Sequence, residues 1–321
     1  MDFTPGYIEL ARSGELSRRA AVAAERLRAC TLCPRACGVD RTAGELGYCR
    51  TGELPTVYSH MSHPGEEPPI SGTQGSGTIF MSGCTLSCVY CQNARFSQGG
   101  EGAERSVADV AGMMLDLEAM GCHNINIVTP THHTHAILAS LAVAAEEGLS
   151  VPLVWNTSSY ELPETLALLD GVVDVYLADI RYAEDANAAR YSDAADYATV
   201  ARAALREMQR QVGTLRMDER GIATGGLIVR HLVLPDGVSG TADCLAFVAN
   251  DLGSETHVSL MSQFYPAHRA HEHARIARRL TASEWDEAVE AHAEAGLING
   301  WVQAFMGEVS PIAGTNLEPD E

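Results

Sequence analysis

The chain has 321 residues, 46% of them hydrophobic, so it is long enough to bury one large α/β core. Asp and Glu outnumber Lys and Arg by 42 to 22, which gives a formal charge of -20. Such a field repels phosphate backbones and anionic lipid surfaces, so we expect neither nucleic acid nor a membrane as partner. No apolar run approaches the roughly 20 residues of a membrane span, and the first residues predict no signal peptide. We therefore expect a cytoplasmic protein.

The N-terminal part of the chain predicts a helix followed by an irregular segment. Residues 15–29 are rich in Ala and Arg at amphipathic spacing, which predicts a helix. From Cys30 to about Ile70 the sequence has little periodicity and much Cys, Gly and Pro, which predicts an irregular segment held together by ligands. Glu66 and Glu67 lie in this segment, either over the mouth of the following domain or in a solvated loop.

Short β-rich runs alternate with longer helical stretches from about Ser76 onward. The predicted strands cover 78–83, 123–129, 151–156, 173–180, 226–234 and 257–262, with a weaker one at 300–305. The predicted helices cover 105–120, 134–148, 161–169, 193–212, 241–252 and 282–296. Alternating strands and helices imply parallel pairing, and the number of units favours a partial or full β/α barrel. We expect three parts: an N-terminal cysteine-rich segment (1–70), the barrel (71–307) and a C-terminal tail (308–321).

Seven of the nine cysteines fall into two groups. The first group is Cys30, Cys33, Cys37 and Cys49, and the second is Cys84, Cys88 and Cys91. Grouped thiols in a large chain without a predicted secretion signal indicate metal rather than disulfides. The two remaining cysteines, Cys122 and Cys244, are expected to be buried small hydrophobes.

The second group directly follows the first predicted barrel strand with the spacing CxxxCxxC. Three thiolates in such a loop can hold three irons of a 4Fe-4S cluster and leave the fourth iron open to another ligand. The alternative is a zinc site that borrows a His or a distant Cys, but the spacing fits the usual zinc pattern poorly.

The first group has the spacing C-x2-C-x3-C-x11-C and forms a closed set of four ligands. Such a set suits either a structural zinc or a second iron–sulfur cluster, and the spacing does not separate these two.

With Tyr90 at the aromatic position of CxxxCxφC, the second group resembles the signature of the radical S-adenosylmethionine (SAM) superfamily. Segments such as 30–49, 75–93 and 259–266 further resemble a pyruvate formate-lyase activating-enzyme-like branch with an N-terminal four-cysteine motif. The resemblance implies a partial (β/α)6-type radical SAM barrel in which SAM chelates the open iron. It also implies an electron donor such as flavodoxin or ferredoxin, whose electron cleaves SAM to give a 5′-deoxyadenosyl radical.

The resemblance further implies cofactor contacts at the strand ends. Where activating enzymes have a GGE segment that contacts the SAM amino group, this chain has Thr129, Pro130, Thr131 and His132. Where they have Asp-x-Lys, it has Asp179 and Arg181, which could alternatively form a structural salt bridge. Further expected cofactor contacts are Tyr90, Asn156, Ser158, Arg230 and Gln263. The neighbouring His133 and His135 are expected to be solvated residues of a first helical turn.

Three functions compete at this stage. The first is activation of a glycyl radical enzyme, in which the radical removes a hydrogen from a glycine of a partner protein. The second is radical chemistry on a small molecule or another peptide. The third belongs to a different class of protein: an electron-transfer or binding protein whose fold is stabilised by metal sites and which does not cleave SAM.

Overall fold

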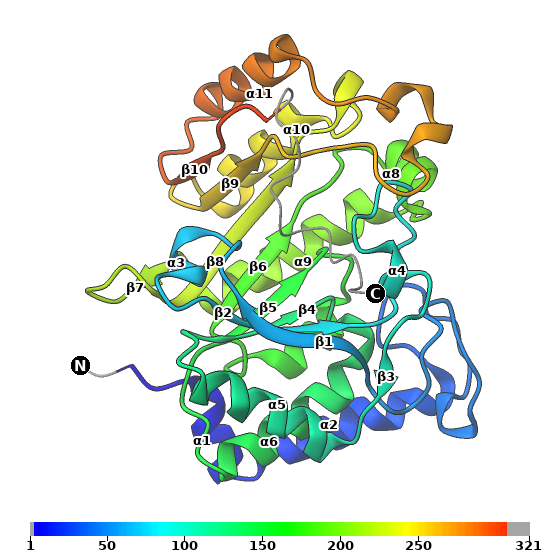
Figure 1. Cartoon of the computed structure of the whole chain (residues 1–321), viewed down its shortest axis with the longest axis vertical. Helices are drawn as coiled ribbons and strands as arrows, with labels where there is room; N and C mark the ends of the chain where they lie inside the picture. Colours follow the sequence, from blue (N-terminus) through cyan, green and yellow to red (C-terminus); the bar gives the residue numbers. More distant parts are fainter. Residues whose placement is uncertain (1–2, 307–321) are drawn as a thin grey trace, which may run out of the picture.

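A computed structural model describes residues 3–306, which form a mixed α/β structure around one sheet (Figure 1). Its strands are β1 (Thr56–His63), β2 (Ser76–Met81), β3 (Ala103–Glu104), β4 (Ile125–Val128), β5 (Leu153–Thr157), β6 (Val175–Asp179), β7 (Arg216–Met217), β8 (Ala223–Leu232), β9 (His257–Met261) and β10 (Gly300–Val302). The order is β10-β9-β8-β6-β5-β4-β2-β1-β3, and β7 pairs with β8. Neighbours from β2 to β10 along this path are parallel, whereas β1 is antiparallel to β2. This confirms the predicted partial β/α barrel.

Helices follow most of the parallel strands. The α-helices are α1 (Gly6–Arg12), α2 (Glu15–Glu25), α3 (Pro68–Ser71), α4 (Ala94–Ser97), α5 (Val107–Ala119), α6 (Thr134–Glu146), α7 (Pro163–Leu166), α8 (Asp185–Ser192), α9 (Tyr197–Val212), α10 (Thr241–Phe247) and α11 (Ala282–Glu294). Shorter turns are η1 (Arg26–Ala29), η2 (Arg41–Ala43), η3 (Thr131–His133), η4 (Ala167–Leu169), η5 (Pro235–Gly237), η6 (Val248–Leu252), η7 (Ala270–Glu272) and η8 (Ala274–Ile276). The predicted strands are confirmed to within a few residues. The predicted helix over 193–212 begins later, at Tyr197, because Asp193 ends α8 with a positive φ of 54°.

Side chains of the central strands alternate between two faces. In β4, Ile125 and Ile127 belong to the core beneath the helices, so the intervening Asn126 faces the barrel interior. In β6, Tyr176 belongs to the same helix-side core, whereas Leu177 packs in a separate interior cluster with Ile70 of α3. The interior therefore combines an apolar cluster with polar side chains.

The N-terminal helices share the core of the barrel. Tyr7, Leu16 and Leu27 are fully buried together with residues of α5 and α6. The Tyr7 hydroxyl donates to the Val151 carbonyl at 2.8 Å. Figure 1 shows α1, α2, α5 and α6 gathered on one side of the sheet. The predicted tail over 308–321 lies outside the described residues.

The expectation of an irregular segment over residues 30–70 is wrong at its C-terminal end. Residues Thr56–His63 form strand β1, which pairs with β2 and β3, and Pro68–Ser71 form the short helix α3. Most of β1 is only half-buried and its sequence mixes Ser and His with apolar residues. The two-residue alternation that marks a strand is therefore weak, and pairing with β2 decides the structure.

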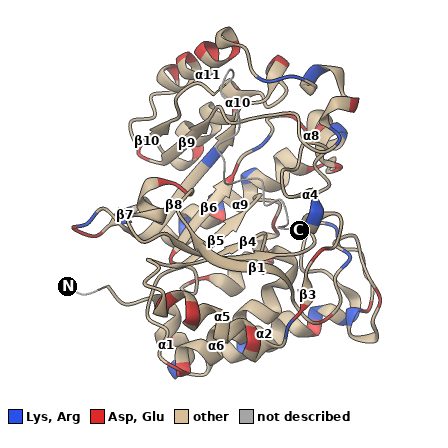
Figure 2. Cartoon of the chain, in the orientation of Figure 1, with Lys and Arg blue, Asp and Glu red and all other residues tan. Residues whose placement is uncertain are grey.

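Acidic residues are spread over the outer helices, as along α11 in Figure 2. In residues 3–306 no helix is both long enough and apolar enough to cross a membrane.

Candidate functional site

The loop that carries Cys84, Cys88 and Cys91 follows β2 and is tied down by backbone hydrogen bonds. The Gly83 N–H donates to the Phe96 carbonyl at 3.0 Å, and the Val89 N–H donates to the Tyr191 carbonyl at 2.9 Å. The Gln98 amide donates to the Cys88 carbonyl at 2.9 Å. These bonds fix a loop that has no regular structure of its own.

Each sulfur of this group has a hydrogen-bonding neighbour. The Ser192 hydroxyl and the Arg181 Nη1 donate to the Cys88 Sγ at 2.9 and 3.2 Å. The Leu86 N–H donates to the Cys84 Sγ at 3.3 Å, and the Cys91 Sγ lies 3.3 Å from the Ser97 hydroxyl. Hydrogen bonds to sulfur are typical of thiolates that bind iron–sulfur clusters, and they tune the reduction potential of the cluster.

Burial makes the Cys84 and Cys91 thiols poor acids without a metal. It raises the pKa of Cys84 to about 12 and also raises the pKa of Cys91. A bound cation would stabilise the thiolates instead. Within residues 3–306, no three His, Cys, Asp or Glu side chains converge closely enough to hold a single metal ion. A cubane cluster binds each thiolate to a different iron and so does not require that convergence.

Charged side chains at the ends of β6 and β8 form a connected network. The Arg230 Nε donates to Asp179 Oδ1 at 2.8 Å, and the Arg181 Nη2 donates to Asp179 Oδ2 at 2.7 Å. Although burial alone would raise it, the two guanidiniums hold the pKa of Asp179 below its usual value. Since Arg181 also reaches the Cys88 Sγ, the network connects the barrel interior to the cysteine loop. The salt bridge foreseen as an alternative is thus present.

One of the three guanidinium nitrogens of Arg181 donates no hydrogen bond in the structure. Its Nε is buried and has no hydrogen-bond partner, although the two terminal nitrogens are engaged. A buried guanidinium N–H without a partner costs free energy, which an anionic ligand would recover. This position fits the carboxylate of an amino acid-like cofactor.

The residues that replace the GGE segment follow β4. Thr129 has a positive φ of 59°, and its N–H donates to the Asn156 carbonyl at 2.9 Å. Thr131 is buried, and its carbonyl accepts from the Thr134 hydroxyl at 2.8 Å. His132 is buried behind the cysteine loop, with its Nε2 2.7 Å from the Ser82 carbonyl. In this structure Thr131 and His132 make protein contacts, and their expected contact with cofactor stays a prediction.

The expectation that His133 and His135 are solvated is wrong. His133 is fully buried, and His135 is 6% exposed with its Nε2 2.7 Å from the Glu53 carbonyl. The N-terminal segment covers this helical turn, which a first-turn position in the sequence does not reveal. Burial lowers the pKa of His132 to about 3 and that of His135 to about 4, so both are neutral at pH 7.

The other expected contacts are dispersed. Asn156 joins the charged network by accepting from the Arg230 Nη2 at 2.6 Å. The Ser158 carbonyl accepts from Tyr197 at 2.8 Å. Tyr90 packs edge-on against Phe264 and is fixed through its hydroxyl. Gln263 is exposed and pairs with Gln303 at 3.2 Å, so the structure does not bring it to the network.

The four N-terminal cysteines lie in one compact turn structure. The Cys30 N–H donates to the Val39 carbonyl at 2.9 Å, which brings the two halves of the motif together. A Cβ on Gly47 would come within 2.5 Å of the Cys37 Sγ. Cys30, Cys33 and Cys49 are buried and Cys37 is exposed. The backbone of the motif is thus compact, but among the described residues its thiols do not converge on a single metal ion, and the structure does not distinguish zinc from a cluster.

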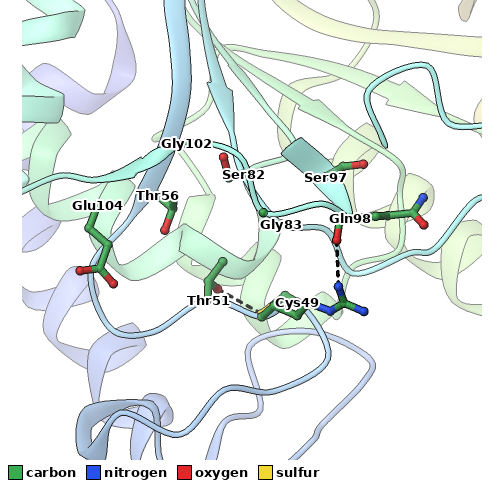
Figure 3. A pocket seen from close by; sticks show the side chains of 11 residues that line it. Cys49, Thr51, Thr56, Ser82, Gly83, Ser97, Gln98, Gly102 and Glu104 are labelled. Atoms are coloured by element: carbon green, nitrogen blue, oxygen red, sulfur yellow. Dashed lines mark hydrogen bonds between the residues drawn. The ribbon is translucent and has the colours of Figure 1, made fainter. Parts of the chain in front are cut away.

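A cavity of about 250 Å³ lies between the N-terminal segment at Cys49 and the residues that directly precede Cys84. Figure 3 shows Cys49 and Thr51 of the N-terminal segment on one side, with Ser82 and Gly83 of the cysteine loop facing them. A Cβ on Gly83 would come within 2.5 Å of the Cys49 carbonyl oxygen, so the two segments touch at this point.

Sequence reasoning missed several residues that contact the site. Ser192 and Ser97 hydrogen-bond to cysteine sulfurs, and Asn126 donates to Glu66 at 3.1 Å inside the barrel. Glu66 itself was among the expectations, either over the barrel mouth or in a solvated loop. Asn126 carries a signal in the sequence, because the run Asn-Ile-Asn-Ile places polar residues at every second position of a strand. No pattern in the sequence marks Ser192 and Ser97, because only the fold brings them to the thiols.

Comparison with known proteins agrees with this site. A family model described as the radical SAM superfamily matches residues 78–210. An uncharacterized protein from Methanocaldococcus jannaschii is 30% identical over 297 residues, covering 88% of this chain and 80% of the relative. The chain belongs to the radical SAM superfamily. Membership implies an enzyme of the radical SAM type that uses a 4Fe-4S cluster and S-adenosylmethionine.

Proposed function

We propose that this protein reductively cleaves SAM at a 4Fe-4S cluster held by Cys84, Cys88 and Cys91 and removes a hydrogen atom from a substrate in the barrel. The supporting observation is the buried, hydrogen-bonded cysteine loop joined by Arg181 to the charged network at the strand ends. When bound, the cluster would supply one electron to SAM, giving methionine and the 5′-deoxyadenosyl radical.

The side chains of this chain would orient the cofactor and exclude water. The unpaired Nε of Arg181 would donate to the methionine carboxylate, while Asp179 holds the guanidinium in place at 2.7 Å. Ser192 would donate to the Cys88 sulfur and so favour the reduced cluster. Tyr90 and Phe264 form an apolar wall beside the cysteine loop.

We also propose that the N-terminal cysteines hold a second metal centre, either zinc or an iron–sulfur cluster. The Arg41 Nη1 lies 3.9 Å from the Cys30 Sγ, and the Cys49 Sγ lies 3.1 Å from the Thr51 hydroxyl. Both contacts suit thiolates. Iron, sulfide and zinc contents of the wild type and of Cys33→Ser would tell the two metals apart.

Activation of a glycyl radical enzyme stays a prediction from the family resemblance. Its test is an organic radical signal in electron paramagnetic resonance after mixing the reduced enzyme, SAM and a partner chain that has the glycyl radical motif. Chemistry on a small molecule or another peptide is the second candidate, and polar side chains such as Asn126 and Glu66 in the barrel interior favour it.

The first test of the proposal is 5′-deoxyadenosine formation by anaerobically reconstituted protein with dithionite and SAM, followed by chromatography. We expect product from the wild type and none from Cys88→Ala. Cys122→Ala removes a buried cysteine outside both groups and serves as the matched control, which should retain activity. An inactive wild type with fully loaded iron and sulfide would support the electron-transfer or binding alternative.

A further inference from the structure

The connection between β1 and β2 places two glutamates inside the barrel. This connection (64–75) contains α3, whose Ile70 fills the apolar interior cluster with Val154 and Leu177. Glu66 and Glu67 directly precede α3, so they lie beside this cluster. Glu67 is buried and the Glu66 side chain is only 10% exposed, which excludes the solvated loop that the sequence left open.

Glu66 is anchored by three strands. Its Oε1 accepts from the Asn126 amide of β4 at 3.1 Å and from the Asn156 amide of β5 at 3.2 Å. Its Oε2 accepts from the Arg230 Nη1 of β8 at 3.2 Å. The buried Glu67 lies close enough to Arg230 and Glu66 to interact electrostatically with both. We call Glu66, Glu67, Asn126, Asn156 and Arg230 the lumen cluster.

The lumen cluster contains two acceptors without a donor. Glu67 Oε2 and Asn126 Oδ1 are both buried and have no hydrogen-bond partner. All three donor nitrogens of Arg230, by contrast, are engaged by Asp179, Glu66 and Asn156. The unpartnered atoms of the lumen cluster are thus acceptors, which a ligand that brings donors would satisfy.

The charges point to the same kind of ligand. The interior network carries three carboxylates, on Glu66, Glu67 and Asp179, against the two guanidiniums of Arg181 and Arg230, an excess of one negative charge when all are ionised. A buried excess charge is costly unless a proton or a cation compensates it. The side chains of Arg230 and Glu66 retain 16% and 10% exposure, so the cluster is not sealed from solvent.

We propose that the lumen cluster recognises a cationic nitrogen group of the substrate, an ammonium or guanidinium, through Glu67 and Asn126. This inference rests on the proposed function, because it assumes that the hydrogen-donating substrate occupies the barrel interior. Glu66 is a positioning residue that holds Asn126 and Arg230, whereas Glu67 and Asn126 would contact the ligand. The substrate class is thus a small molecule or a peptide side chain with a positively charged nitrogen.

The test uses anaerobically reconstituted full-length protein with methylammonium chloride and methylguanidinium chloride as probes at millimolar concentration. The measurement is the shift of the thermal unfolding midpoint, with N-methylacetamide at equal concentration and sodium chloride at equal ionic strength as controls. We expect a saturable increase with at least one cation and none with the controls. Glu67→Gln should raise the half-saturating concentration tenfold or more, whereas the exposed Glu290→Gln on α11 should match the wild type.

Glu67→Asp keeps the negative charge but withdraws it by one methylene, so it should raise the half-saturating concentration less than Glu67→Gln does, which keeps the test usable if Glu67→Gln does not fold. No saturable response to either cation in the wild type would overturn the inference, because a proton on Glu67 would then compensate the charge. Deoxyadenosine is measured in the same samples. Deoxyadenosine without cation binding refutes only the lumen inference, and cation binding without deoxyadenosine refutes only the SAM chemistry.

Discussion

At the scale of single residues, Gly83 shows why the cysteine loop needs a particular amino acid. Its φ of 79° is accessible to glycine without strain, and a Cβ there would collide with the Cys49 carbonyl and with Thr51. The residue before Cys84 therefore allows the N-terminal segment to touch the cysteine loop. The sequence shows a glycine before Cys84, but it does not show that Cys49 and Thr51 would pack against it.

Arg181 offers the most direct prediction at this scale. Arg181→Lys keeps the positive charge but loses the fork that spans Asp179 and the Cys88 sulfur. We expect the KM for SAM in deoxyadenosine formation to rise by about 10- to 100-fold, the usual effect of losing a hydrogen bond to a charged group. The exposed Arg220→Lys serves as control. An unchanged KM would show that Arg181 does not bind the cofactor carboxylate.

At the scale of elements, the turn η3 and the start of α6 form a buried junction between β4 and the N-terminal segment. The buried Arg41 donates from Nη1 to the His132 carbonyl at 2.8 Å and from Nη2 to the Gly52 carbonyl at 2.6 Å. His135 contacts the Glu53 carbonyl in the same region. Arg41 and His135 therefore fasten the cysteine-rich segment to the barrel.

These buried histidines predict a loss of stability in acid. The folded-state pKa of His135 is about 4, below the unfolded value near 6.5, so the unfolded chain binds the extra proton between these pH values. The free energy of unfolding should fall as the pH decreases from about 6.5 to 4. His135→Gln should reduce this slope by about one proton, or about 1.4 kcal/mol per pH unit.

The measurement is urea unfolding across that pH range. Exposed His271→Gln is the matched control and should leave the slope unchanged. An equal slope in wild type and His135→Gln would mean that His135 is already charged in the folded protein.

Helix α2 and η1 give a second prediction at the element scale. Leu27 is fully buried in the core shared with α6, so Leu27→Ala should lower the free energy of unfolding by about 2–5 kcal/mol. Val22 is 37% exposed on the same stretch, and Val22→Ala should cost much less. Chemical denaturation compares the two. Equal losses of unfolding free energy in the two variants would contradict a core shared by η1 and α6.

At the scale of the whole molecule, the formal charge of -20 opposes the compact state through self-repulsion. Salt screens this repulsion, so the midpoint of thermal unfolding should rise as KCl increases from about 0.05 to 0.5 M. Removing two charges on α11, with Asp286→Asn and Glu290→Gln, should make the rise smaller. Calorimetry measures both proteins. A midpoint that falls with salt would show that attractive ion pairs dominate instead.

The sequence by itself determined the order of the main parallel strands and of the longer helices between them, the cysteine loop after the first parallel strand and the fold class. These features depend on local patterns: hydrophobic periodicity, turn residues and ligand spacing. Strand-end positions such as Asp179 and Arg230 could also be predicted, because parallel strands bring their carboxyl ends to one edge. Gln263 shows the limit of this rule, since its side chain turns away to Gln303.

Only the tertiary structure decided which distant residues meet. Strand β1, with its weak alternation, forms because β2 supplies hydrogen-bonding partners. His133 and His135 are buried because the N-terminal segment covers them. Glu66 becomes an interior group because α3 carries the chain into the barrel, where Asn126 and Arg230 compensate its burial. Burial and charge pairing depend on contacts between residues far apart in the chain, and local sequence patterns do not specify those contacts.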